Sequence, residues 1–159
     1  MTELAEPAAD DAGEAVVVRL GSGRFAVALG SVAEVGRVPA ITRIPGSPDW
    51  LAGVANWRGR LMPVLDLRSL LGADRTPFTS SARLLVLVDD GVSAGLVVDG
   101  VEGTGSLGAQ VDDFPAAFAG PGAELLAGQV PRDDGPVAVI DPVAVLRLRE
   151  NLPRTRRTA

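Results

Sequence analysis

The stretch that indicates the fold most directly is GVANWRGRLMPVLDLR, which runs from Gly53 to Arg68. Two runs of strand-forming residues, GVANW and RLMPVLDL, meet in it at Arg58-Gly59. Because glycine permits a tight turn, the pattern predicts a β-hairpin with Arg58 at the turn. Pro63 cannot donate to a sheet ladder, so its strand is expected to be an edge strand or to be bulged there. A full positive charge at the turn of an otherwise apolar hairpin calls for an explanation.

Similar strand and turn patterns recur along the rest of the chain. Hairpins are predicted over residues 16–29, 83–101 and 124–140, and a further strand over 31–38. Short helices are expected over residues 66–72 and 141–151, and a short helical turn over residues 47–51, with Ser47, Asp66 and Asp141 as caps. About ten short strands and two or three short helices predict an all-β fold of small barrels or sandwiches. The simplest partition is two five-stranded lobes divided near residues 73–82.

The composition is that of a globular protein, with 159 residues, 47% of them apolar, and a formal net charge of −5. Residues 1–14 are acidic and are expected to be disordered, whereas residues 151–159 form a basic tail that is expected to be solvated. The negative balance argues against nucleic-acid binding. With neither a secretory signal nor an apolar run of the ~20 residues that span a membrane, the sequence predicts a cytoplasmic protein without membrane insertion.

The chemistry available to the chain is narrow, because the sequence contains no His, Cys, Lys or Tyr. The usual general base, the thiol nucleophile, the Schiff-base lysine and the nitrogen or sulfur metal ligands are therefore missing. Carboxylates remain, and Asp89-Asp90, Asp112-Asp113 and Asp133-Asp134 are the pairs that a hydrolase or a cation-binding protein would use. Each pair adjoins Gly or Pro in a predicted turn, where Asp favours local backbone hydrogen bonds. We therefore assign no catalytic residue and no metal ligand.

The segment GTGSLG, from Gly103 to Gly108, matches the G-x-G-x-x-G pattern of dinucleotide-binding loops. That motif also needs a helix whose N-terminus meets the pyrophosphate, and the residues that follow show no helical periodicity. We interpret the glycines as flexible hairpin residues and expect no cofactor.

Glu34 lies in the predicted third strand, which is as apolar as the strand that leads to Arg58. If the two strands are neighbours in one sheet, the two charges can pair, and a half-buried pair would hold the guanidinium in a fixed pose. The alternative is a solvent-exposed pair worth ~0–1 kcal/mol. The pattern alone leaves both open.

At this point the chain resembles a known family, the CheW-like adaptor domains. The resemblance covers about residues 16–148 and rests on four segments: FAVALGSVAEVGRVPAITRIPGSPDWLAGV (25–54), GVANWRGRLMPVLDLRSLLG (53–72), AGLVVDGVEG (94–103) and ELLAGQV with PVAVIDPVAVL (124–146). It implies two intertwined five-stranded SH3-like β-barrel lobes in a single domain over residues 15–150. The first lobe would comprise about residues 15–72 plus exchanged terminal elements, and the second about 83–140.

The resemblance also implies a function, because the family couples chemoreceptors to the histidine kinase CheA and catalyses no reaction. Arg58 matches the family's receptor-binding arginine, Glu34 its acidic partner, and Val32, Gly53 and Val101 the receptor groove between the lobes. No residue is assigned to the kinase contact. A location at receptor arrays on the inner face of the membrane is implied, and an adaptor of the same fold in a surface-motility or developmental pathway is the alternative.

Overall fold

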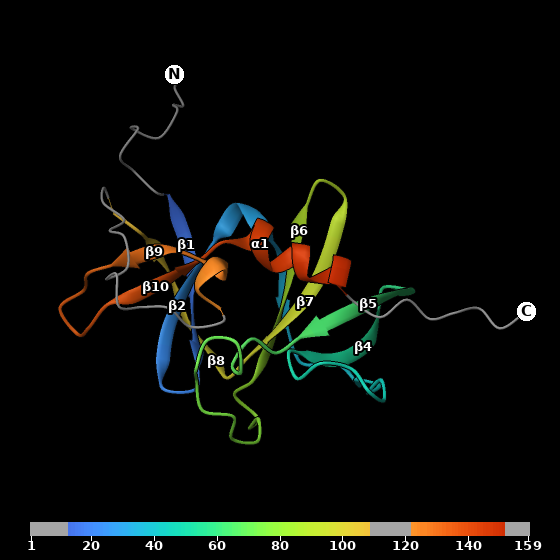
Figure 1. Cartoon of the computed structure of the whole chain (residues 1–159). Helices are drawn as coiled ribbons and strands as arrows, with labels where there is room; N and C mark the ends of the chain where they lie inside the picture. Colours follow the sequence, from blue (N-terminus) through green and yellow to red (C-terminus); the bar gives the residue numbers. More distant parts are fainter. Residues whose placement is uncertain (1–12, 109–121, 152–159) are drawn as a thin grey trace, which may run out of the picture.

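The computed structural model describes residues 13–108 and 122–151, and their strands form two five-stranded sheets (Figure 1). Sheet A has the strand order β8-β1-β2-β10-β9, and sheet B has the order β3-β6-β7-β5-β4. Sheet A consists of β1 (Glu14–Leu20), β2 (Gly23–Ala28), β8 (Gly100–Ser106), β9 (Leu126–Val130) and β10 (Val137–Ile140). Sheet B consists of β3 (Val32–Gly36), β4 (Leu51–Trp57), β5 (Arg60–Leu65), β6 (Arg83–Asp89) and β7 (Val92–Val98). The expected all-β class is confirmed.

The predicted hairpins are all present as antiparallel pairs, namely β1–β2, β4–β5, β6–β7 and β9–β10. Glu14, which was expected in the acidic segment, is the first residue of β1, and the remainder of that prediction (1–12) lies outside the described residues. Pro63 was expected in an edge strand or at a bulge. β5 is not an edge strand, because it lies between β4 and β7, but the β4–β5 register shifts between Leu51 and Gly53, next to the pairing of Val54 with Pro63. The paired residues of β5 and β7 begin at Val64, so Pro63 faces no β7 partner that needs its missing N–H.

The expected division of the lobes near residues 73–82 does not describe the sheets. The strands β3, β4 and β5 precede that segment, yet they belong to one sheet with β6 and β7, which follow it. The physical reason is that β5 pairs with β7 in parallel, and a parallel pair needs a long connection between its strands. Sheet B is therefore inserted between β2 and β8, and sheet A joins strands from both ends of the chain.

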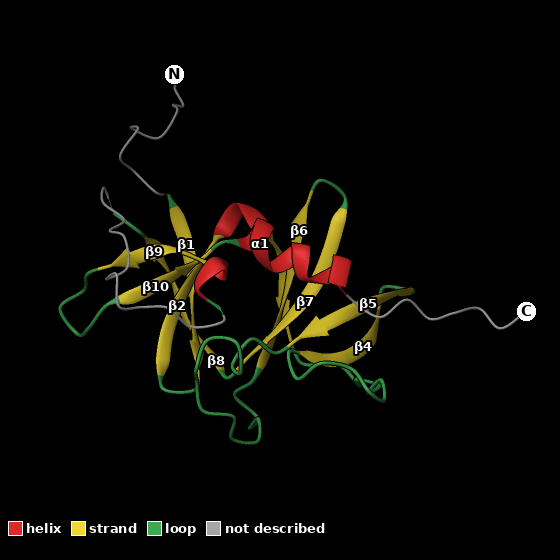
Figure 2. Ribbon diagram, viewed as in Figure 1, coloured by secondary structure: helices red, strands yellow, loops and turns green. Residues whose placement is uncertain are grey.

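The helix expected at residues 66–72 is a series of turns instead, whereas the helical turn expected at residues 47–51 is present as a turn (Figure 2). At residues 47–51 a single backbone bond from Leu51 N to Pro48 O precedes β4. At residues 66–72 the Asp66 carboxylate accepts from the Arg68 backbone N–H, as a helix cap would, and also from the Arg68 guanidinium, but the residues that follow form turns and no helix. The other expected helix, α1 (Pro142–Arg147), is confirmed, and the Asp141 side chain accepts from two backbone N–H groups of its first turn.

Short 3-10 turns complete the fold: η1 (Leu29–Ser31), η2 (Ala123–Leu125) and η3 (Leu148–Asn151). Helix α1 leaves sheet A after β10 and packs against β6 and β7 of sheet B (Figure 1). The helix that follows the last strand of sheet A therefore packs on sheet B.

The largest apolar cluster lies between the two sheets and takes buried side chains from both of them and from α1. Alternate residues of a strand serve different clusters, as the two-residue period of a strand requires. In β6, Leu85 and Leu87 point to this central cluster, whereas Leu84 and Val86 point to a second cluster on the other face of sheet B. A third cluster lies on sheet A around Val130 and Val139. Burial on both faces explains why these strands read as nearly continuous apolar runs.

Gly53 occupies a position in β4 that excludes side chains. Its φ is +149°, and a Cβ atom built on it would collide with the backbone carbonyl oxygen of Thr42. Thr42 is held there by reciprocal backbone hydrogen bonds with Val54, of 2.8 and 2.9 Å. The glycine therefore lets the 39–50 connection lie directly against β4.

We predict that Gly53→Ala lowers the free energy of unfolding by at least about 1–3 kcal/mol, because the strained backbone and the collision act together. Gly105→Ala is the matched control, since Gly105 has no positive φ and a Cβ added to it would meet no atom within 4 Å. Thermal or urea unfolding measures both variants. Equal melting temperatures for the two would refute this role of Gly53.

Candidate functional site

Arg58 lies in a two-residue turn between β4 and β5. Its φ is +51° and that of Gly59 is +81°, so both central residues adopt the left-handed conformation that tight hairpins favour. The Asn56 side-chain oxygen accepts a hydrogen bond of 2.9 Å from the Gly59 N–H. A positive φ is uncommon for a residue with a side chain. The turn thus imposes a costly backbone geometry on Arg58 and fixes the direction in which its side chain leaves the sheet.

The Arg58 guanidinium is held by Glu34 of β3. Its Nε and Nη2 atoms donate to one carboxylate oxygen, Oε2, at 3.2 and 2.8 Å. The Arg58 side chain is 73% exposed and that of Glu34 is 35% exposed. The Trp57 ring centre lies 5.9 Å from Arg58 Cζ. Of the two interpretations that the sequence left open, the structure favours the solvent-exposed pair, in which one edge of the guanidinium is held and the rest faces solvent.

The Arg58–Glu34 pair also links the two edges of sheet B. Glu34 lies in β3 and Arg58 directly follows β4, and these two strands lie at opposite ends of the strand order. Trp57, the last residue of β4, also lies against β3, because a Cβ atom added to Gly36 of β3 would be 3.7 Å from the Trp57 ring. The position of Arg58 therefore depends on the curvature of the whole sheet as well as on its own turn.

A groove of about 630 Å³ lies beside Arg58. Its floor includes Met62 and Val86, which are both 4% exposed. Leu61, on its rim, is 77% exposed, more than any other large apolar side chain among the described residues. The remaining lining comes from strands β3 to β7, from the β4–β5 and β6–β7 turns and from η3, and comprises Ala33, Glu34, Trp57, Arg58, Arg60, Val88, Gly91, Ser93 and Arg149. The groove thus has apolar side chains on its floor and at Leu61 and Val88, and three arginines on its rim.

The structure brings together two of the five residues that the sequence singled out for receptor binding. Glu34 and Arg58 line this groove, whereas Val32, Gly53 and Val101 do not. Val32 and Val101 are partly buried and pack against the central core from β3 and β8, and Gly53 accommodates the 39–50 connection. The groove expected between the lobes is therefore not the hollow beside Arg58. The roles of these five residues in binding stay predictions.

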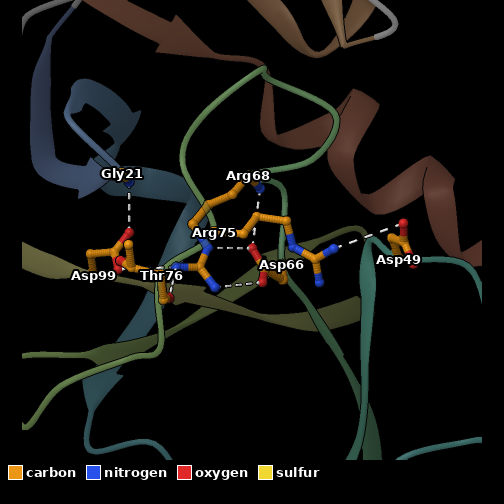
Figure 3. A network of polar contacts seen from close by, with 7 residues as sticks. All are labelled: Gly21, Asp49, Asp66, Arg68, Arg75, Thr76 and Asp99. Atoms are coloured by element: carbon orange, nitrogen blue, oxygen red, sulfur yellow. Dashed lines mark hydrogen bonds and ion pairs between the residues drawn. The ribbon is translucent and has the colours of Figure 1, made fainter.

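Sequence reasoning missed a buried polar network at the other end of β5 (Figure 3). The Arg68 guanidinium donates to both oxygens of Asp66, each at 3.0 Å, and through Nη1 to Asp99 at 3.2 Å and to the Thr76 carbonyl at 2.7 Å. Its Cζ lies 3.8 Å from the centre of the Phe78 ring. The side chains of Arg68, Asp66 and Asp99 are 5%, 6% and 15% exposed. The charges are therefore paired in a site nearly closed to water.

The network joins segments that are distant in sequence. Asp99 lies between β7 and β8, and its second carboxylate oxygen accepts from the Gly21 N–H in the β1–β2 turn at 2.7 Å. Arg68 thus connects the end of β5, the segment around Thr76 and the two sheets. The signal that was available in the sequence was a charged Asp-x-Arg at the end of an apolar strand, and we interpreted its Asp as a helix cap.

A second polar cluster, on sheet A, is solvated. Arg24 of β2 donates to both carboxylate oxygens of Asp134, at 2.9 and 2.7 Å. These hydrogen bonds hold the pKa of Asp134 below its usual range and raise the pKa of Arg24. Since Arg24 also lies 3.8 Å from Glu102, its charge is already matched by neighbouring carboxylates.

The other motifs in the sequence take part in ordinary backbone structure. Gly103 to Ser106 belong to β8, an edge strand, rather than to the flexible hairpin that we expected. Asp90 and Gly91 form the β6–β7 turn, and Asp112-Asp113 lie outside the described residues. Within residues 13–108 and 122–151, no group of three or more His, Cys, Asp or Glu side chains is placed to hold a metal ion. No helix in this part of the chain is long and apolar enough to cross a membrane.

Comparison with known proteins places these features in a family, since the family model for the CheW-like domain matches residues 14–150. The chain belongs to the CheW-like domain family. The crystal structure of the scaffolding protein TtCheW from Thermoanaerobacter tengcongensis superposes with a TM-score of 0.73 and 26% sequence identity, over 81% of this chain and 88% of that one. The CheW-like fold with two five-stranded sheets is thereby confirmed.

Curated relatives include proteins with three different names. Protein PilI of Pseudomonas aeruginosa is 44% identical over 54% of this chain and 48% of its own length. Chemotaxis protein CheW of Klebsiella aerogenes is 31% identical over 61% of this chain and 58% of its own length. Protein FrzA of Myxococcus xanthus is 36% identical over 54% of this chain and 53% of its own length. The chain thus spans about half the length of these relatives.

We predict that Arg68→Met lowers the free energy of unfolding by about 3–5 kcal/mol, because it leaves Asp66 and Asp99 buried without their counterion. Arg75→Met is the control, since Arg75 is 46% exposed and lies 3.8 Å from Asp49, which is 80% exposed. An exposed pair of that kind contributes ~0–1 kcal/mol.

Urea unfolding of the Arg68→Met and Arg75→Met variants measures the difference between their free energies of unfolding. The double variant Asp66→Asn with Arg68→Met should recover part of the loss, since one uncompensated charge is removed. If Arg68→Met cost no more than Arg75→Met, the network would not hold the sheets together.

Proposed function

We propose that this protein is a non-enzymatic adaptor that couples chemoreceptors to a CheA-type histidine kinase. The observation that carries the proposal is the Arg58–Glu34 pair at the rim of an apolar groove, in a chain of the CheW-like family. The guanidinium is oriented by its turn and by Glu34, yet it keeps most of its surface for a partner. Pre-orientation of this kind reduces the entropy that binding would otherwise cost.

The groove has the composition of a protein-binding surface rather than of a small-molecule site. Arginine and large apolar side chains are enriched where proteins bind one another, and Arg58, Trp57, Leu61 and Met62 meet here. The receptor would supply its cytoplasmic helical hairpin tip, whose apolar side chains would contact Leu61 and the groove floor. Val32, Gly53 and Val101 are proposed to shape or contact the same receptor surface. The kinase would supply its regulatory domain, at a surface to which we assign no residue.

The proposed adaptor acts by binding alone, at receptor arrays on the cytoplasmic face of the membrane, with no cofactor, no nucleic acid and no direct membrane insertion. Support for a non-enzymatic role comes from the family and from a sequence without His, Cys, Lys or Tyr. The carboxylate pairs that a hydrolase would use are engaged in turns where they are described.

A second candidate is an adaptor of the same fold in a kinase pathway other than flagellar chemotaxis, such as surface motility or development. PilI, at 44% identity, exceeds the 31% identity of Klebsiella aerogenes CheW, whereas FrzA, at 36%, equals the 36% of the probable chemotaxis protein CheW of Rhizobium etli; the identity of PilI therefore favours keeping the candidate. Pull-down with the tagged chain against the receptors and CheA-type kinases of its own organism, pathway by pathway, separates the two. Retention of no receptor and no kinase would refute both.

We predict that Arg58→Ala weakens receptor binding by about 2 kcal/mol or more, the typical cost of removing an interface hot spot. The variant should change the free energy of unfolding by only ~0–1 kcal/mol, because the pair that it breaks is solvent-exposed. Isothermal titration with a receptor cytoplasmic fragment and a thermal melt measure the two effects. Arg43→Ala removes an exposed arginine that lies outside the groove, and serves as the control.

The two measurements distinguish recognition from a structural role. Binding by Arg58→Ala as tight as that of the Arg43→Ala control would refute recognition by Arg58. A collapsed melting curve would show instead that the Arg58–Glu34 pair mainly holds the edge strands of sheet B together.

A further inference from the structure

The groove beside Arg58 carries a charge opposite to that of the chain. The protein has a formal net charge of −5, yet the groove is lined by three arginines, Arg58, Arg60 and Arg149, and by a single carboxylate, Glu34. That carboxylate is already occupied by Arg58 at 2.8 Å. Among the described residues, neither Arg60 nor Arg149 has an ion-pair partner. The basic rim is therefore not neutralised within the described part of the fold.

Arg149 is the more informative of the two, because its side chain is half-buried. A guanidinium that is partly removed from water without a counterion is unfavourable, and such charges are ordinarily paired in folded proteins. Arg149 lies in η3 and faces the groove, whereas Arg147, two residues earlier, is exposed and lines a different hollow with Glu124. The C-terminal end of the helical segment thus directs one arginine specifically to the groove.

The apolar surface of the groove sets a second requirement for its occupant. Leu61 is 77% exposed and Val88 is 37% exposed, and both line the hollow above Met62 and Val86. Exposed large apolar side chains gathered in a hollow with a polar rim are typical of protein-binding surfaces. An apolar stripe bordered by charges matches one face of an amphipathic helix, on which polar residues flank the apolar positions.

We propose that this groove binds an acidic amphipathic helix of the partner, with apolar side chains on Leu61 and Val88 and carboxylates paired to Arg60 and Arg149. The inference rests on the proposed function, in which that helix belongs to the receptor hairpin tip, and it adds the chemistry that the tip must carry. Arg58 would then set the register, while Arg60 and Arg149 select partners with carboxylates on both sides of the apolar stripe.

The test uses the full chain and a soluble cytoplasmic hairpin fragment of a receptor from the same organism. Dissociation constants are measured at low and high salt for the wild type and for Arg60→Glu, Arg149→Glu and Arg147→Glu. The first two should weaken binding at low salt by about tenfold or more, because each places like charges opposite each other. Arg147→Glu makes the same change of charge next to the groove, and should stay within about twofold of the wild type, as non-contacting surface charges do.

Two further measurements make the result specific. Wild-type binding should weaken as salt is raised, and the Arg60→Glu, Arg149→Glu double variant should lose most of that salt dependence. Exchange of one acidic residue of the fragment for Arg should restore binding to Arg60→Glu or to Arg149→Glu but not improve binding of the wild type. If Arg149→Glu melts early, Arg149→Gln replaces it and should weaken binding in the same direction.

The outcomes separate this inference from the proposed function. If the wild type binds the fragment, Arg58→Ala weakens binding and the glutamate variants behave like Arg147→Glu, the acidic-helix inference is wrong and the adaptor function stands. Absence of any binding by the wild type overturns both.

Two other occupants would also overturn the inference. Loss of the Arg60→Glu and Arg149→Glu effects when Glu3, Glu6, Asp10 and Asp11 are neutralised would show that these arginines pair with the chain's own acidic segment and not with the partner. A dimer in sedimentation that Arg149→Glu dissociates would show that a second copy does.

Discussion

The constraint on which the rest of the structure depends is the position of the Arg68 guanidinium. Two carboxylates, a backbone carbonyl and an aromatic ring surround it, and they come from three segments: Asp66 at the end of β5, Thr76 and Phe78 in the connection to β6, and Asp99 between β7 and β8. A buried guanidinium tolerates few displacements, since any loss of a partner leaves a charge in a low-dielectric site. Its hydrogen bonds therefore set how the end of β5 lies against the β7–β8 junction. Through Asp99 and Gly21 the same constraint reaches the β1–β2 turn of sheet A.

Burial of the apolar core supplies the free energy that holds the two sheets together. By itself, however, the core fixes the position of one sheet relative to the other less precisely than the Arg68 network does. Leu, Val and Ala side chains dominate the central cluster, and apolar cores accept more than one arrangement of similar volume. Hydrogen bonds to a planar guanidinium demand particular directions as well as distances. The network thus complements the core: burial favours the association of the two sheets, and Arg68 selects one registration of them. The groove at the far end of sheet B depends on that registration, because its rim combines β3, the β4–β5 turn and η3.

Features set by neighbouring residues were predicted correctly from the sequence, whereas features set by contacts between distant segments were not. The hairpins, the Asp141 cap and the turn at Arg58-Gly59 follow from residues within a few positions of one another, and all are present. The division into lobes was wrong, because the parallel pairing of β5 with β7 leaves no local pattern. The helix expected at residues 66–72 was wrong for a related reason. Asp66 makes the backbone hydrogen bond of a cap to the Arg68 N–H, but its carboxylate also binds the Arg68 guanidinium, which Asp99 and the Thr76 carbonyl hold in place, and turns follow instead of a helix.

Two arginine–carboxylate pairs thus lie ten positions apart on either side of β5, and they differ in one physical respect. Arg68 is 5% exposed and has its hydrogen-bonding groups directed at protein atoms, so its contribution is structural. Arg58 is 73% exposed and is held along one edge by a single carboxylate oxygen, so most of its donors are directed to solvent. The residue types are identical, and the sequence, which places Arg58 at a turn and Arg68 two residues after Asp66, does not give the burial of either side chain. Burial decides which pair stabilises the fold and which remains available to a partner, and burial here is set by the order of the strands.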